Sequence, residues 1–263
     1  MEIFGYIASV FIGISLGLIG GGGSILTVPV LVYFFGIDVF LATEYSLFIV
    51  GVTSMVGSFS YFKKGLVHLR TAFIFGIPSI VSIFLTRNFL LLLLPDKVFK
   101  IGSLTFTKDI FILVIFAGLM IVASYKMIHK STVMKTTNYS AKTNTLLVAG
   151  EGSVVGILTG LVGAGGGFMI IPALVNLLRK PMKVAIGTSL VIISLNSLVG
   201  FFSSMNSVRI EWHLLATISA VAILGIIIGS QISKKIDGKK LKPAFGWFVL
   251  IMGIYILIKE LFL

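Results

Sequence analysis

The chain has 263 residues, of which 57% are hydrophobic and only 11% are charged. Soluble proteins of average composition carry about 25% charged residues, so this composition excludes the soluble globular class. Several successive apolar runs reach roughly 18 residues or more, which is long enough for a helix to cross a bilayer. No alternating segments of about ten residues, typical of a membrane barrel, occur. We therefore predict an all-α, polytopic membrane protein.

The composition also argues against several kinds of chemistry. The chain contains no cysteine, which excludes disulfides, thiol nucleophiles and Cys-ligated metals. The three histidines, His68, His129 and His213, are far apart and near the ends of predicted spans, so no metal site is expected. The net charge of +12 is better explained by basic cytoplasmic loops than by nucleic-acid binding. No catalytic or nucleotide-binding motif is present, so neither an enzyme, a cofactor nor an ATP-driven pump is predicted.

The first half begins with an apolar segment at 3–19. Met1-Glu2 is not a basic leader and no small-residue cleavage site follows, so we interpret this segment as a mature helix rather than a signal peptide. The first glycine stretch, residues 20–24, interrupts the apolar run, and a short apolar segment follows at 25–35. After a turn at Gly36-Ile37-Asp38, spans are predicted at about 39–60, at 71–94 with a kink at Pro78, and at 109–128, with a loop from Leu94 to Lys108.

The second half repeats this order. A polar linker, 131–143, separates a first membrane repeat (1–130) from a second one (144–263). The second repeat begins with an apolar segment at 145–162, which leads into the second glycine stretch, residues 163–167. A short segment follows at 168–178 and ends at Arg179-Lys180-Pro181. Three spans come next, at 184–204, 213–232 and 244–262, with a basic loop at 233–242.

The two halves align in a single register, the one that places Gly17 on Gly160. Glycines, a proline and a serine match in this register, which chance similarity between apolar spans does not explain. The further matches are Gly20 with Gly163, Gly22 with Gly165, Gly23 with Gly166, Pro29 with Pro172, and Ser46 with Ser189. An internal duplication is predicted, and we call this alignment the repeat register.

Each glycine stretch either interrupts a crossing helix or forms the tip of a re-entrant hairpin. With hairpins, 15 of the 21 basic residues fall on one side of the membrane; with crossing helices the division is 12 to 9. The positive-inside rule favours the hairpins. We therefore predict two inverted repeats, each a glycine-broken re-entrant hairpin plus three transmembrane helices, in the cell inner membrane with both termini non-cytoplasmic.

The glycine stretches are the predicted binding site. Near-consecutive glycines break helices, and broken backbone at membrane depth is tolerated where protein or a water-filled cavity covers it. Paired breaks of this kind point to a transporter binding site. Ser24 is expected to cap the short helix that follows. The amides of residues 22–25 and 166–169 are expected to face a small anion in a polar hollow near the midplane, without any buried Lys or Arg. The alternative is that the glycines serve tight helix packing.

Polar residues beside the stretches extend this site. Thr53, Ser54, Ser58 and Ser197 continue the faces of neighbouring spans, although Ser and Thr often only bond to a helix carbonyl one turn earlier. Glu44 and Glu151 are the acids nearest membrane depth, and Glu44 is the candidate for proton coupling, with an interfacial carboxylate as the alternative. The predicted substrate-binding residues are Gly20, Gly21, Gly22, Gly23, Ser24, Thr27, Ser46, Gly163, Gly165, Gly166, Gly167, Thr188, Ser189 and Asn196.

The duplicated motifs GLIGGGGSILTVP (residues 17–29) and GLVGAGGGFMIIP (residues 160–172), followed by ATEYSL and AIGTSL, resemble the sulfite exporter TauE/SafE family over nearly the whole chain. The resemblance implies a bacterial-type inner-membrane protein that moves sulfite, sulfoacetate or related sulfur-containing anions. Glu44-Tyr45-Ser46 departs from the Gly-Thr-Ser pattern that the second half keeps at residues 187–189.

Three functions are considered, and no motif in the sequence supports the third. The first is a secondary carrier that exports a small sulfur-containing oxyanion, with proton coupling; the second is a passive anion channel; the third is a membrane enzyme or assembly factor. The predicted partners are a small anionic substrate and the lipid bilayer. The sequence does not determine the oligomeric state, for which a homodimer is one candidate.

Overall fold

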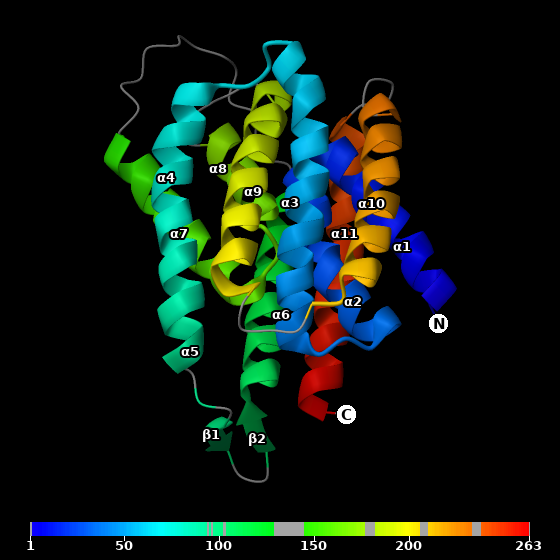
Figure 1. Ribbon diagram of the computed structural model, residues 1–263, viewed down its shortest axis with the longest axis vertical. Helices are drawn as coiled ribbons and strands as arrows, with labels where there is room; N and C mark the ends of the chain where they lie inside the picture. Colours follow the sequence, from blue (N-terminus) through cyan, green and yellow to red (C-terminus); the bar gives the residue numbers. More distant parts are fainter. Residues whose placement is uncertain are drawn as a thin grey trace.

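The computed structural model describes residues 2–93, 95, 97–101, 104–128, 145–176, 182–205, 210–232 and 238–262. The protein is a bundle of helices with one small β-hairpin in this described part (Figure 1). Six of the described helices are long and apolar enough to cross a membrane. The prediction of an all-α, polytopic membrane protein is confirmed.

The first half forms a helical hairpin followed by three long helices. The rings of Tyr6 in α1 and Phe35 in α2 stack edge-to-face with centroids 5.3 Å apart, so the outer ends of the two hairpin arms lie together. The first glycine stretch is therefore the tip of a hairpin, and not a break in a crossing helix. The elements are α1 Glu2–Ile19, the 3₁₀ helix η1 Gly21–Leu26, α2 Thr27–Phe35, α3 Val39–Lys63, α4 Leu69–Leu85, the π-helix η2 Thr86–Leu90, α5 Leu91–Leu93 and α6 Lys108–Ile128.

The second half repeats the hairpin and the long helices. Its elements are α7 Thr145–Val162, α8 Gly167–Asn176, α9 Met182–Ser204, α10 Trp212–Ile232 and α11 Gly238–Phe262. The predicted linker 131–143 and the turn at Arg179-Lys180-Pro181 lie outside the described residues. The last helix begins at Gly238 rather than at residue 244, so part of the predicted basic loop is the first turns of α11.

The loop predicted from Leu94 to Lys108 contains an antiparallel β-hairpin instead. Strand β1, Lys97–Ile101, pairs with β2, Leu104–Thr107. The two short runs are rich in β-branched and aromatic residues, which favour strands, and Gly-Ser separates them in the sequence. The β-hairpin connects α5 to α6 at the end of the bundle near the C-terminus (Figure 1).

Helix α1 lies against α10, and the two run in the same direction. Gly13 packs against the carbonyl of Ala222, and one turn later Gly17 packs against the carbonyl of Ile226. Any side chain at either glycine would collide with the backbone of α10. Small residues thus allow two membrane helices to approach backbone to backbone.

Helix α7 lies against α4 in the same way. Gly156 packs against the carbonyl of Ser79, and Gly160 packs against Thr86. The repeat register places Gly13 on Gly156 and Ser79 on Ala222, so the α4–α7 contact is the counterpart of the α1–α10 contact. Helix α4 runs opposite to α10, so the α1–α2 and α7–α8 hairpins open toward opposite ends of the bundle (Figure 1).

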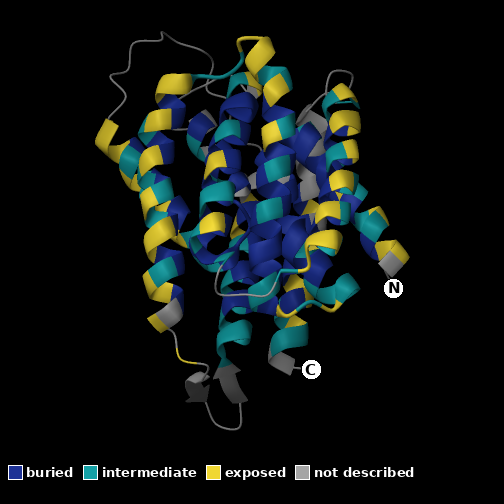
Figure 2. Ribbon diagram, in the orientation of Figure 1, coloured by how far each residue is buried: buried dark blue, intermediate teal, exposed yellow. Residues whose placement is uncertain are grey.

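The core of the bundle is formed by α3 and α9, which cross with opposite directions near Gly51 and Leu198. Figure 2 shows buried residues concentrated in these central helices and exposed residues on the outer ones. The exposed side of α4 is apolar and carries Phe73, Ile77 and Val81 at helical spacing. Such a surface suits contact with lipid chains. Many hydroxyl side chains of the long helices are buried instead, among them Thr53, Ser54 and Ser197.

Candidate functional site

The two glycine stretches meet in the core of the protein. Gly21 in the first stretch and Gly167 at the start of α8 are in backbone contact, and a methyl group at either position would overlap the other chain segment. The two helix starts therefore come together, as predicted, and their backbones are in direct contact. The prediction of a hollow is wrong at this point, because no space for an ion remains between Gly21 and Gly167 themselves.

Each stretch ends its preceding helix at a glycine with a positive φ. Gly20 has φ of 79° and Gly163 has φ of 72°, both in the left-handed region that glycine adopts without strain. Their amides complete the helices by donating to Leu16 O and Thr159 O, each at 2.8 Å. The chain can thus reverse at membrane depth while its backbone groups stay bonded.

The second arm of each hairpin, which follows the glycine stretch, begins with a different type of helix in the two halves. The first begins as a 3₁₀ helix, and Ser24 Oγ donates to Gly21 O at 2.7 Å within it. The prediction that Ser24 caps α2 is therefore wrong: Ser24 lies inside a helical turn and its hydroxyl bonds back to a carbonyl. A 3₁₀ helix leaves its first amides without partners inside the helix, here those of Gly21 and Gly22.

The second return is an α-helix that begins at Gly167. The amide of Met169 donates to Gly166 O at 3.0 Å, so this amide is not available to an anion as predicted. The amides of Gly166, Gly167 and Phe168 precede the first intrahelical bonds. Both stretches therefore retain main-chain donors in the core, although fewer than the sequence indicates.

Buried hydroxyl groups surround the stretches. A methyl group built on Gly165 would lie 2.8 Å from Ser197 Oγ, and one built on Gly166 would overlap Thr159 Oγ1. Within the described part of the chain several buried side-chain oxygens have no hydrogen-bond partner: Thr27 Oγ1, Ser46 Oγ, Thr53 Oγ1, Ser54 Oγ, Thr159 Oγ1, Asn196 Oδ1 and Ser197 Oγ. Unpaired buried hydroxyls are costly, at about 1–3 kcal/mol each, and are therefore candidates for contact with a substrate.

The other predicted residues have partners within the protein. Ser189 Oγ lies beside Gly20 but donates to Ile186 O at 2.9 Å, which is the ordinary helix bond. Thr188 Oγ1 accepts from the His68 amide at 2.9 Å, so it connects α9 to the start of α4. Gly23 packs against Ile12 and Ser15 of α1, so it serves the close approach of the two hairpin arms.

Asn196 is held on one side only. Its Nδ2 donates to Ser79 Oγ at 2.7 Å, while its Oδ1 is among the unpartnered atoms described above. The residue is fully buried in α9, near the crossing with α3. A mid-membrane amide with a fixed donor and an unused acceptor can contact a hydrogen on a substrate or an entering water.

A buried arginine lies next to the second glycine stretch, contrary to the prediction of a site without Lys or Arg. Arg87 Nη1 donates to Glu44 Oε1 at 2.5 Å, and neither side chain is exposed. Ser204 Oγ donates to the other carboxylate oxygen of Glu44 at 2.7 Å. Glu44 is thus fully buried within the protein and paired with Arg87.

Sequence reasoning missed Arg87 because it lies near the end of a long apolar run. One signal in the sequence could have found it. A carboxylate at membrane depth needs a partner, and Arg87 is a cation in a neighbouring span. The π-helix Thr86–Leu90 that carries Arg87 is not visible in the sequence, but π-turns frequently occur at functional sites.

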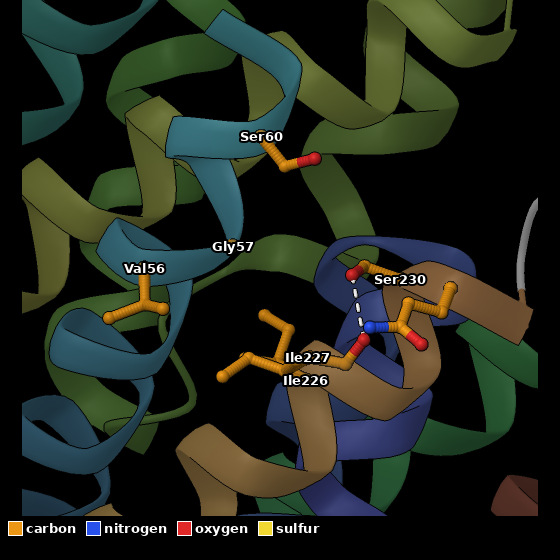
Figure 3. Close-up of a pocket in the computed structure, with 7 residues that line it drawn as sticks. Val56, Gly57, Ser60, Ile226, Ile227 and Ser230 are labelled. Carbon is orange, nitrogen blue, oxygen red and sulfur yellow. Dashed lines mark hydrogen bonds between the residues drawn. The ribbon is translucent and has the colours of Figure 1, made fainter. Parts of the chain in front are cut away.

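A cavity of about 240 Å³ lies between α3 and α10 (Figure 3). Helix α3 contributes Val56, Gly57 and Ser60, and α10 contributes Ile226, Ile227, Ser230 and Gln231. The repeat register relates Ser230 to Arg87 and Gln231 to Asn88. The cavity and the ion pair therefore occupy corresponding places near opposite ends of the bundle.

The fold and site define a polytopic membrane protein whose core is built from two broken helical hairpins. The family profile described as "Sulfite exporter TauE/SafE" matches residues 6–256. The chain belongs to this family.

Similar proteins include a "Probable membrane transporter protein" of Xylella fastidiosa strain Temecula1, 27% identical over 94% of this chain and 91% of that protein. "Probable membrane transporter protein YunE" of Bacillus subtilis is 27% identical over 93% of each chain. A protein of Methanocaldococcus jannaschii with the same kind of name is 28% identical over 96% of this chain and 94% of its own. No solved structure matches the chain at a significant level.

Proposed function

We propose that this protein is a secondary transporter that exports a small sulfur-containing oxyanion of the sulfite or organosulfonate type. The observation that carries the proposal is the meeting of two glycine stretches in the core, with main-chain amides and unpartnered hydroxyls around them. Helix starts and free amides favour anions. The family membership supports the class of protein, and the anion chemistry of the site supports the class of substrate.

The contact between Gly21 and Gly167 favours a carrier over a channel. A channel needs a continuous open path, whereas these two backbones touch in the core. An anion that binds beside them requires the two hairpins to part, which links binding to a conformational change. We propose that the halves are inverted copies related by an axis in the membrane plane, and that the end holding both termini is non-cytoplasmic. The proposed location is the cell inner membrane.

Glu44 is the proposed proton carrier. Its carboxylate is buried and accepts from Arg87 and Ser204. It belongs to α3, whose Thr43 packs against Gly163 of the second glycine stretch. A protonatable group at this depth is a functional candidate. Proton entry through Glu44 would then be coupled to the export of the anion.

The experiment is uptake into proteoliposomes that contain the purified protein. Sulfite, thiosulfate, sulfoacetate and sulfate are offered in turn, with and without a pH gradient. Saturable flux with counter-transport of labelled substrate is expected for a carrier. Flux that rises linearly with concentration would establish the channel instead, and the absence of flux for all four anions would refute the proposal.

A further inference from the structure

The guanidinium group of Arg87 is fully buried but only partly used. Its Nη1 donates to Glu44 Oε1 at 2.5 Å and to Thr43 Oγ1 at 3.3 Å. In contrast, Nε and Nη2 have no hydrogen-bond partner among the residues that the structure describes. These two groups form one edge of the guanidinium, with parallel N–H bonds that match two oxygens of one oxyanion.

Arg87 lies beside the second glycine stretch. Thr43, which accepts from Arg87 Nη1, packs directly against Gly163. Thr86, the neighbour of Arg87 in the chain, packs against Gly160 at the end of α7. The charged group and the main-chain donors of this stretch therefore belong to one region of the core.

The region of the second half that corresponds to Arg87 and Glu44 has no ion pair among the described residues, so the packing of these helices does not depend on one. The repeat register places Ser230 opposite Arg87 and Gly187 opposite Glu44. Glu44 accepts a hydrogen bond from Ser204, and the counterpart of Ser204 in this register is Tyr61. Gly187, the counterpart of Glu44, packs against Tyr61 in the same way. The same helix arrangement thus exists without either charge, so the pair at Arg87 and Glu44 is a specific feature of one site.

We propose that Arg87 is an anion-binding residue, whose Nε and Nη2 hold two oxygens of a sulfite or sulfonate group while Glu44 and Thr43 hold Nη1. This inference rests on the proposed function and identifies the charged group of that site. Glu44 balances the charge of Arg87 before the anion arrives. The hydrogen bond from Ser204 keeps the carboxylate on the Nη1 edge, which leaves the opposite edge for the substrate.

The test is the substitution Arg87→Lys, measured as the half-saturating sulfite concentration for proteoliposome uptake. Lysine keeps the positive charge but lacks the two parallel donors. We expect a rise of about tenfold or more, the size of effect that the loss of a charge-assisted hydrogen bond produces. The matched control is Arg70→Lys, at an exposed position of α4, the helix that leads into the π-helix of Arg87, for which no change is expected.

A second variant distinguishes loss of anion binding from loss of folding. Replacement of both charges, Arg87→Met with Glu44→Met, removes the pair without leaving one charge buried and alone. We expect this variant to remain folded, judged by its thermal unfolding in detergent, and to lose saturable sulfite uptake.

Three results would overturn the assignment. The first is an unchanged half-saturating concentration in Arg87→Lys while the natural protein transports sulfite; this leaves the proposed function in place. The second is a lower maximal rate with unchanged half-saturation, which would make Arg87 a support for Glu44 rather than a ligand. The third is the absence of anion flux in the natural protein, which removes both proposals.

Discussion

Gly21 and Gly167 bring the two halves of the chain into backbone contact in the middle of the protein. The two residues are far apart in the sequence, and each belongs to a different glycine stretch. Such contact is open only to residues without a side chain, because a methyl group on either would overlap the other backbone.

Substitution of Gly21 or Gly167 by alanine should therefore destabilise the protein. Overpacking against backbone costs about 1–3 kcal/mol, and the neighbouring atoms cannot move aside as a flexible side chain would. The matched control is Gly118→Ala in α6, where the added methyl group meets no atom within 4 Å. Thermal unfolding of the purified variants measures the difference; equal midpoints for Gly21→Ala and Gly118→Ala would contradict the contact.

The pair of Glu44 and Arg87 should show strong energetic coupling. Removal of one partner leaves a buried charge alone and is expected to cost about 3–5 kcal/mol in the free energy of unfolding. Removal of both should cost less than the sum of the two single changes. A double-mutant cycle with Glu44→Ala, Arg87→Ala and the double variant gives the coupling energy, and additive effects would show that the two groups do not interact.

Glu44→Gln tests proton coupling. Glutamine can still accept from Arg87 through its single carbonyl oxygen, and its NH2 group can donate to Ser204 Oγ, but it cannot bind and release a proton. We therefore expect sulfite flux to become independent of the pH gradient. Arg87 is the charged side chain that contacts Glu44 in the described part of the chain. The matched control is Glu260→Gln on α11, where the carboxylate accepts from Tyr33 Oη at 3.1 Å. Gradient-driven flux that survives in Glu44→Gln would remove its role.

The membrane orientation can be tested with labels, because the chain has no natural cysteine. Single cysteines at Asp38 and Lys64, which lie beyond opposite ends of α3, should react with a membrane-impermeant thiol reagent from opposite sides. Reporter fusions at residues 137 and 238 should report one common side, the cytoplasm. If these two fusions report different sides, the inverted arrangement is wrong.

The hairpins were predictable because their signals are local. Glycine runs break a helix at identifiable residues, and the charges of the loops distinguish a hairpin from a crossing helix. The site was less predictable, since its chemistry depends on pairs that are distant in sequence. The contact of Arg87 with Glu44 joins residues on different helices, and the direction of the Ser24 hydroxyl depends on a 3₁₀ turn that composition does not reveal. The β-hairpin at Lys97–Thr107 was missed because its short strands lie between two strong apolar spans.

The inequality between the two ends of the bundle has a kinetic consequence. One end is closed by Arg87 and Glu44, whereas the corresponding place at the other end holds Ser230 and a cavity. In the empty carrier the Nε and Nη2 groups of Arg87 stay buried without a partner among the described residues. In the loaded carrier the bound anion would satisfy both of them. We therefore expect the return of the empty protein to limit its turnover, so that exchange of labelled for unlabelled anion is faster than net export.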